Sequence, residues 1–88
     1  MKIFAIGDRE MLIGFWLSGI KQSLETEDPS EALRFIHGIE QREKACLMLI
    51  QSKIYHEIEE NMKEIQERKA SFIFYEFSGG GLKWRKKK

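Results

Sequence analysis

Four short segments with strand signals alternate with segments that carry helical signals, and this alternation constrains the fold more than any other feature. These runs span residues 2–6, 20–25, 45–50 and 71–77. The first and third are apolar at almost every position, which is typical of strands covered on both faces. The second alternates poorly, as a short edge strand does, and the fourth is rich in aromatic residues.

Each segment between two runs predicts a helix. Asp8 can cap a first helix that ends near Gly19. The motif Asp28-Pro29-Ser30-Glu31 combines a capping residue, a proline at the first helical position and a glutamate three positions after the cap. It predicts a helix over 29–42. A stripe of apolar residues at helical spacing predicts one long helix over 52–69, and its members are Ile54, Ile58, Met62 and Ile65.

Strands that alternate with helices predict an α/β fold with a parallel sheet. Because crossovers are right-handed and the two most apolar strands should be central, we expect a flavodoxin-like (receiver-like) four-stranded parallel sheet, order 2-1-3-4, flanked by helices. The chain of 88 residues makes one domain. We assign residues 1–78 to the α/β domain and 79–88 to a Gly-rich basic tail that we expect to be flexible.

Functional groups of such a fold gather where the strands end, so these ends are the places to look for known chemistry. The phosphate-binding loop G-x-x-x-x-G-K-[ST] and the dinucleotide turn G-x-G-x-x-G are both absent from the sequence. Gly7 is therefore interpreted as easing a tight turn. A phosphoacceptor site of the receiver type needs a carboxylate after the third strand, where this chain has Gln51-Ser52, and only Asp8 and Glu10 follow the first strand.

The remaining reactive side chains do not form a recognisable site. His37 and His56 lie on different predicted helices without paired-ligand spacing. Cys46 lies in an apolar run and is interpreted as a core residue. We therefore expect no enzyme activity, no catalytic residue, no cofactor and no bound metal.

Aromatic residues are numerous for so small a core, which favours an interaction subunit. The fourth strand presents rings on both faces. We predict that the partner-binding residues are Phe15, Trp16, Leu17, Phe74, Phe77 and Trp84. The tail carries five bases and no acid, whereas the rest of the chain has ten bases and fourteen acids. Nucleic-acid binding through residues 83–88 is a weaker hypothesis, because the acidic body repels phosphate.

Three segments resemble the F subunit of archaeal and vacuolar-type (A/V-type) rotary ATPases. The first is the opening I-F-A-I-G-D-R-E-M-L-I-G-F-W-L-S-G-I, in which the matching residues are Ile6, Gly7, Asp8, Gly14, Phe15, Leu17, Gly19 and Ile20. The second is D-P-x-E-A-L, matched by Asp28, Pro29, Glu31, Ala32 and Leu33. The third is an apolar strand followed by a long charged helix, from Leu47 to Arg68.

The resemblance implies a non-catalytic central-stalk (rotor) subunit. Such a subunit docks to the coiled-coil D subunit beside the catalytic head and supports coupling of ATP turnover to ion transport. It would be cytoplasmic and reach the membrane only through the complex. The family usually continues into a C-terminal helix, for which residues 79–88 are too short and too rich in glycine. The alternative hypothesis is a divergent receiver-like signalling domain that lacks the phosphoacceptor carboxylate.

Overall fold

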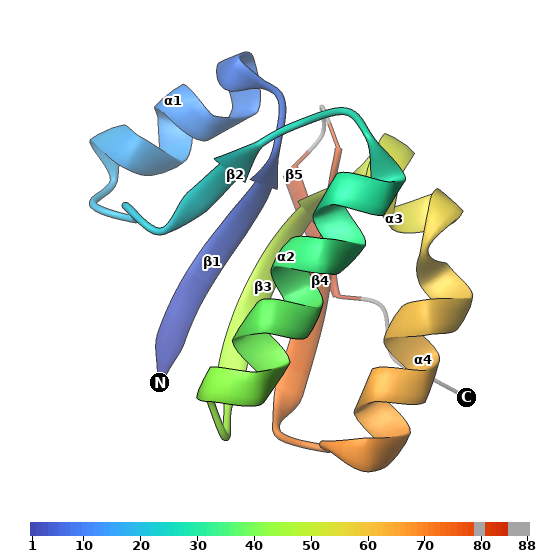
Figure 1. Ribbon diagram of the computed structural model, residues 1–88. Coiled ribbons are helices and arrows are strands. Elements are labelled where there is room, and N and C mark those ends of the chain that lie inside the picture. Colours follow the sequence, from blue (N-terminus) through green and yellow to red (C-terminus); the bar gives the residue numbers. More distant parts are fainter. Residues whose placement is uncertain (79–80, 85–88) are drawn as a thin grey trace.

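The computed structural model describes residues 1–78 and 81–84, which form a sheet with helices on both faces (Figure 1). Its elements, in chain order, are β1 (Lys2–Gly7), α1 (Arg9–Leu17), β2 (Ser23–Glu25), α2 (Pro29–Arg42), β3 (Cys46–Gln51), α3 (Ser52–Glu57), α4 (Glu59–Arg68), β4 (Phe72–Ser78) and β5 (Gly81–Trp84).

The sheet has the order β2-β1-β3-β4-β5. Its first four strands are parallel, which confirms the predicted order 2-1-3-4. The fifth strand pairs antiparallel with β4, in the register Tyr75 to Trp84. Residues 81–84, which were assigned to the tail, thus add a strand. Residues 79–80 and 85–88 lie outside the described residues, so the flexibility expected of the tail stays a prediction.

One face of the sheet is covered by α2, α3 and α4 (Figure 1). Alternate residues of the three long strands point to this face, and most of them join one apolar core. Glu76 also points to this face and is buried, but it is charged. The strand members of this core include Phe4, Ile6, Met48, Ile50, Phe72 and Phe74. The predicted stripe of Ile54, Ile58, Met62 and Ile65 supplies the core from the helices.

Of the helices described in residues 1–78, α1 is the one that covers the opposite face. Met11 and Leu12 of α1 pack on Ala5 and Leu49 in a second, smaller core. The helix ends as its sequence predicts, because Gly19 has a φ of 98° and its amide donates to the carbonyl of Trp16. The rest of this face is half-buried or exposed, and its side chains are Ile3, Leu47, Ile73, Tyr75 and Phe77.

The predicted long helix over 52–69 is wrong in one respect, since the structure divides it into α3 and α4 at Ile58. The φ and ψ of Ile58 are −117° and 16°, outside the helical range. Neither glycine nor proline marks the break. Hydrogen bonding resumes at once, because the Met62 amide donates to the carbonyl of Ile58 at 3.0 Å. The apolar stripe therefore stays continuous and gave no sign of the interruption.

The start of α2 is at Pro29, as predicted, but both bonds of the expected capping box differ. Asp28 accepts from the amide of Ser30 at 3.0 Å. Glu31 does not accept from the Asp28 amide directly. Instead Thr26 accepts from that amide and donates its hydroxyl proton to the Glu31 carboxylate. Thr26 is itself buried, so this relay gives its hydroxyl the partners that a buried polar group needs.

Candidate functional site

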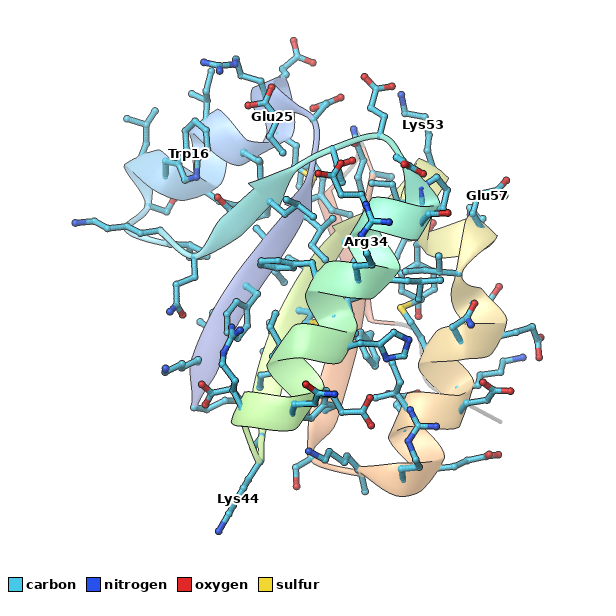
Figure 2. All side chains as sticks on the ribbon, viewed as in Figure 1. Trp16, Glu25, Arg34, Lys44, Lys53 and Glu57 are labelled. Carbon is cyan, nitrogen blue, oxygen red and sulfur yellow. The ribbon has the colours of Figure 1, made fainter. Side chains whose placement is uncertain are left out.

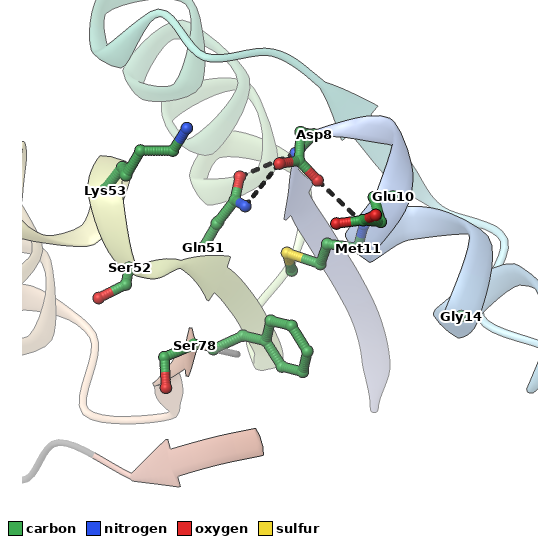
Figure 3. Close-up of a pocket in the computed structure, with 9 residues that line it drawn as sticks. Asp8, Glu10, Met11, Gly14, Gln51, Ser52, Lys53 and Ser78 are labelled. Atoms are coloured by element: carbon green, nitrogen blue, oxygen red, sulfur yellow. Dashed lines mark hydrogen bonds between the residues drawn. The ribbon is translucent and has the colours of Figure 1, made fainter. Parts of the chain in front are cut away.

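The ends of β1 and β3 meet at the point where the strand order reverses, which is where open α/β sheets usually bind their ligands. In this protein two side chains join across that point (Figure 3). The Asp8 amide donates to Gln51 Oε1 at 2.9 Å, and Gln51 Nε2 donates to Asp8 Oδ2 at 2.8 Å. We call this reciprocal pair the Asp8–Gln51 clasp.

Both oxygens of the Asp8 carboxylate accept hydrogen bonds within the chain. Its second oxygen accepts from the amide of Met11 at 2.9 Å, which caps α1 as predicted. The hydrogen bond from Gln51, followed by the one from the Met11 amide, holds the pKa of Asp8 below its ordinary value. A carboxylate held in this way stays ionised and serves to hold α1 on the sheet.

Gly7 is required because neighbouring side chains come very close to its backbone. A Cβ added there would lie 2.4 Å from Met11 Sδ and 3.0 Å from Gln51 Cβ. Its φ is not positive, so the turn itself does not need glycine. The interpretation that Gly7 eases a tight turn is thus replaced by one of close packing under the clasp.

A second polar group lies at the ends of β3 and β4, on the side covered by α3. The buried Glu76 of β4 accepts the hydroxyl proton of Ser52, and its carboxylate lies 3.1 Å from His56 Nε2. Ser52 and His56 stand four positions apart, on one side of α3. The Glu76 carboxylate lies between the serine and the histidine, and the Ser52 hydroxyl donates a hydrogen bond to it. In this arrangement His56 is not placed to accept that proton, as nucleophilic catalysis would need.

A pocket of about 470 Å³ opens between α1 and the ends of β3 and β4 (Figure 3). Its lining includes the clasp, the side chain of Phe77 and the polar ends of Glu10, Ser52, Lys53 and Ser78. Gly14 and Met11 of α1 form its remaining wall. The apolar floor and the internally bonded polar rim suit the packing of another apolar side chain better than the binding of a charged small molecule.

Metal-ligating and membrane-spanning features can be assessed only for the residues that the structure describes. Within residues 1–78 and 81–84, no group of three or more His, Cys, Asp or Glu side chains is arranged to hold a metal ion. None of the helices described is long and apolar enough to cross a membrane. His37 and His56, the two histidines considered as metal ligands, pair instead with Glu40 and Glu76.

The six predicted partner-binding residues fall in different places. Phe15 and Phe77 meet edge to face on the α1 side, with ring centroids 5.3 Å apart. Trp16 lies on the opposite flank of α1, where its Nε1 donates to Ser23 Oγ of β2 at 2.8 Å (Figure 2). Leu17 is 85% exposed.

Phe74 and Trp84 do not join them. Phe74 is 1% exposed and lies in the core under α2, α3 and α4, out of reach of any partner. Trp84 is described through its backbone alone, as the partner of Tyr75 in β5. Phe74 and Phe77 differ by an odd number of positions on one strand, so they point to opposite faces. The odd spacing in the sequence was therefore a signal that only one of these two rings could lie on a given face of the sheet.

Sequence reasoning missed two exposed apolar residues on the α1 side. Ile13 is 44% exposed and stands one turn before Leu17, and Ile3 of β1 is 40% exposed. The exposed large apolar side chains of the described residues are Met1, Ile3, Ile13 and Leu17. The signal that could have found Ile13 is the composition of α1, REMLIGFWL, in which only the first two residues carry charge. A helix that is apolar on all sides needs cover on all sides.

Comparison with known proteins gives a consistent result. The chain matches the family described as ATP synthase (F/14-kDa) subunit over residues 3–79. It is 31% identical over 67 residues to the F subunit of the A-type ATP synthase from Methanocaldococcus jannaschii, covering 76% of this chain and 68% of that protein. It is 27% identical, with the same coverage, to the corresponding F subunit from Methanococcus aeolicus. No solved structure matches the chain with significance.

Proposed function

The chain belongs to the family of the ATP synthase (F/14-kDa) subunit, and from this premise we propose that it is a non-catalytic rotor subunit in the central stalk of an A-type ATP synthase. In this proposal it docks to the coiled-coil D subunit and supports the coupling of ATP turnover to ion transport. It lies on the cytoplasmic side and is peripheral to the membrane as part of the complex.

The observation that carries the docking role is the apolar outer surface of α1. Ile13 and Leu17 stand four positions apart, so they lie on one flank of the helix and form a short exposed ridge. No charged side chain follows Glu10 on this helix. This exposed apolar ridge, beside the half-buried rings of Phe15 and Phe77, supports a docking role for the α1 side.

The non-catalytic role is supported by the way in which the groups at the strand ends are used. Asp8 is held by Gln51 and the Met11 amide, and Glu76 is held by Ser52 and His56. Each of these side chains already has a structural partner. A docking subunit needs such groups only to fix the surface that it presents.

Binding to the isolated D subunit tests the proposal. Titration calorimetry with the wild-type protein should give a stoichiometric complex. The variant Leu17→Gln, which removes the most exposed apolar side chain of α1, should weaken binding by about tenfold or more if this residue is a binding hot spot. Arg34→Gln is the matched control, because Arg34 is exposed on α2 on the other side of the sheet (Figure 2). Failure of the wild-type protein to bind D would refute the role.

A further inference from the structure

The break between α3 and α4 leaves backbone hydrogen bonds unmade, although the two helices follow one another on the same face of the sheet (Figure 1). In a continuous helix over 52–69, the amides of residues 59–61 would donate to the carbonyls four positions earlier. In the described structure these bonds are absent, and bonding resumes at the Met62 amide, which donates to the Ile58 carbonyl. Because no glycine or proline lies in this segment, a contact from elsewhere in the fold is the cause to look for.

Such a contact is made by Glu76 of β4, whose carboxylate is buried on the side of the sheet that α3 covers. It accepts a hydrogen bond from the hydroxyl of Ser52, at the first position of α3. The same carboxylate oxygen lies 3.1 Å from Nε2 of His56, one turn later. Two contacts one turn apart fix the position of α3 and also its rotation about its own axis. We call these two contacts the α3 anchor.

The α3 anchor holds the side of α3 that is turned away from the apolar stripe. A helix turns by about 100° per residue, and Ser52 and His56 each stand two positions from Ile54, so both lie roughly 160° from it around the axis. In a continuous helix, Met62 and Ile65 would lie within roughly 80° of Ile54. The stripe alone would therefore be served by one straight helix. The anchor adds a contact between β4 and the far side of α3, and an interruption lets the segment satisfy both.

The buried charge of Glu76 calls for a reason. Taking a carboxylate out of water opposes folding, and an apolar residue of similar size at such a site is often neutral or stabilising. A buried polar group can, however, specify one arrangement among several that the apolar residues allow. We propose that Glu76 has this role: the α3 anchor keeps segment 52–69 in two helices, and without it the segment closes into the single helix that its stripe predicts. This inference is independent of the proposed docking, which concerns the opposite face.

Amide hydrogen exchange measured by NMR tests the proposal at the break itself. The amides of residues 59–61 gain a helical partner only if the break closes, so in wild type they should exchange faster than the Met62 amide. Glu76→Met removes the carboxylate and keeps an unbranched side chain of similar length. In this variant, exchange of the three amides should slow by about tenfold or more. The Cα resonance of Ile58 should also move to a helical position.

Two matched variants serve as controls. Glu76→Gln keeps a side-chain oxygen that accepts from the Ser52 hydroxyl, so the break and the fast exchange should remain. Glu57→Met places the same new side chain at an exposed position of α3, where Figure 2 shows the glutamate on the outer surface. Exchange at residues 59–61 should then equal that of wild type.

Slower exchange in Glu76→Met, with both controls unchanged, supports the α3 anchor as the cause of the break. If Glu76→Met folds and the three amides still exchange fast, the break is set locally, by acids such as Glu59 and Glu60 at the start of α4, and the inference is wrong. Slow exchange of these amides in the wild-type protein would also overturn it.

A second variant decides the question if Glu76→Met does not fold. Ser52→Ala/His56→Ala removes the α3 anchor from the helix side and leaves the sequence of β4 unchanged. His56 is exposed and Ser52 is half-buried, so the double change leaves the apolar core intact. Exchange at residues 59–61 should again slow by about tenfold or more, and an unchanged rate would refute the inference.

Discussion

The two faces of the sheet are covered by helices of different character. One face is covered by α2, α3 and α4, and the other by α1. On the first, apolar residues point inward and charged residues point outward, as Arg34 and Glu57 do in Figure 2. Glu40 of α2 and Arg68 of α4 form a two-pronged ion pair, with N–O distances of 3.0 and 3.1 Å, which holds the pKa of Glu40 below its ordinary value. On the second, apolar residues point both ways.

The difference shows that the charged side of an amphipathic helix, such as α2, is the side that faces water, whereas α1 has no such charged side. An outer surface of paired charges, as on α2 and α4, needs no further contact. The outer surface of α1 exposes Ile13 and Leu17 and leaves apolar strand residues uncovered beside it. Among the described residues, that side is the part of this small domain that the proposed docking would bury.

The largest expected effect comes from two neighbours on β4 that point to opposite faces. Phe74→Ala removes a ring that is 1% exposed, and it should lower the free energy of unfolding by about 3–5 kcal/mol. Tyr75→Ala, on the half-covered face, should cost about 1–2 kcal/mol in the isolated protein. Urea unfolding followed by circular dichroism measures both. Equal losses would mean that the two faces are equally packed in solution.

A smaller effect is expected at the base of α1, where two glycines behave oppositely. Gly7→Ala forces its Cβ against Met11 Sδ and Gln51 Cβ, and it should destabilise the fold by about 1–3 kcal/mol. Gly14→Ala meets no neighbour and should stabilise it by about 0.5–1 kcal/mol. Thermal melting of the two variants beside wild type gives the sign of each change. A loss of stability in Gly14→Ala would contradict the open space that surrounds this position in the structure.

The covered side is closed at one end by Lys69, whose ammonium group donates to the carbonyls of Glu40 and Glu43 at the end of α2. Lys69→Met removes a cation from a helix C-terminus and should cost about 1 kcal/mol. Lys44→Met is the control, since Lys44 is exposed and projects away from the sheet (Figure 2). Urea midpoints of the two variants should differ, and identical midpoints would show that the Lys69 contacts add nothing.

The smallest effect concerns acid stability on the α1 side. Because the pKa of Asp8 is lowered in the folded state, its contribution is present above the ordinary aspartate pKa and is lost as pH falls through the folded value. Gln51→Ala removes the largest cause and should raise the pKa of Asp8 toward its ordinary value, near 4. A carbon-13 titration of the carboxyl groups measures this. The pKa of Glu40, set by Arg68, should stay constant in the same spectra.

The sequence predicted the parts of the fold that rest on local signals. The beginning of α2 at Pro29 and the end of α1 at Gly19 each depend on residues within one turn, so they were found correctly. The break at Ile58 and the strand Gly81–Trp84 were not found. The first leaves the apolar stripe unchanged, and the second lies between glycines and lysines that are typical of a linker.

The candidate surface was predicted in part, for a related reason. Both faces of β4 carry rings, so composition could not tell which ring is covered. Only the topology assigns α1 to one face and three helical segments to the other. With that assignment, Phe77 packs against Phe15 on the α1 side and Phe74 belongs to the core.

The strand order also has a consequence for how the chain folds in time. Partners in β1 and β2 stand 18 positions apart and those in β3 and β4 stand 26 apart, whereas β1 and β3 join residues 44 apart. Two local halves can therefore assemble before they meet along the central seam. Residues of that seam, such as Phe4 and Met48, should slow refolding least when mutated. The Asp8–Gln51 clasp lies at the end of this seam and closes when the halves join.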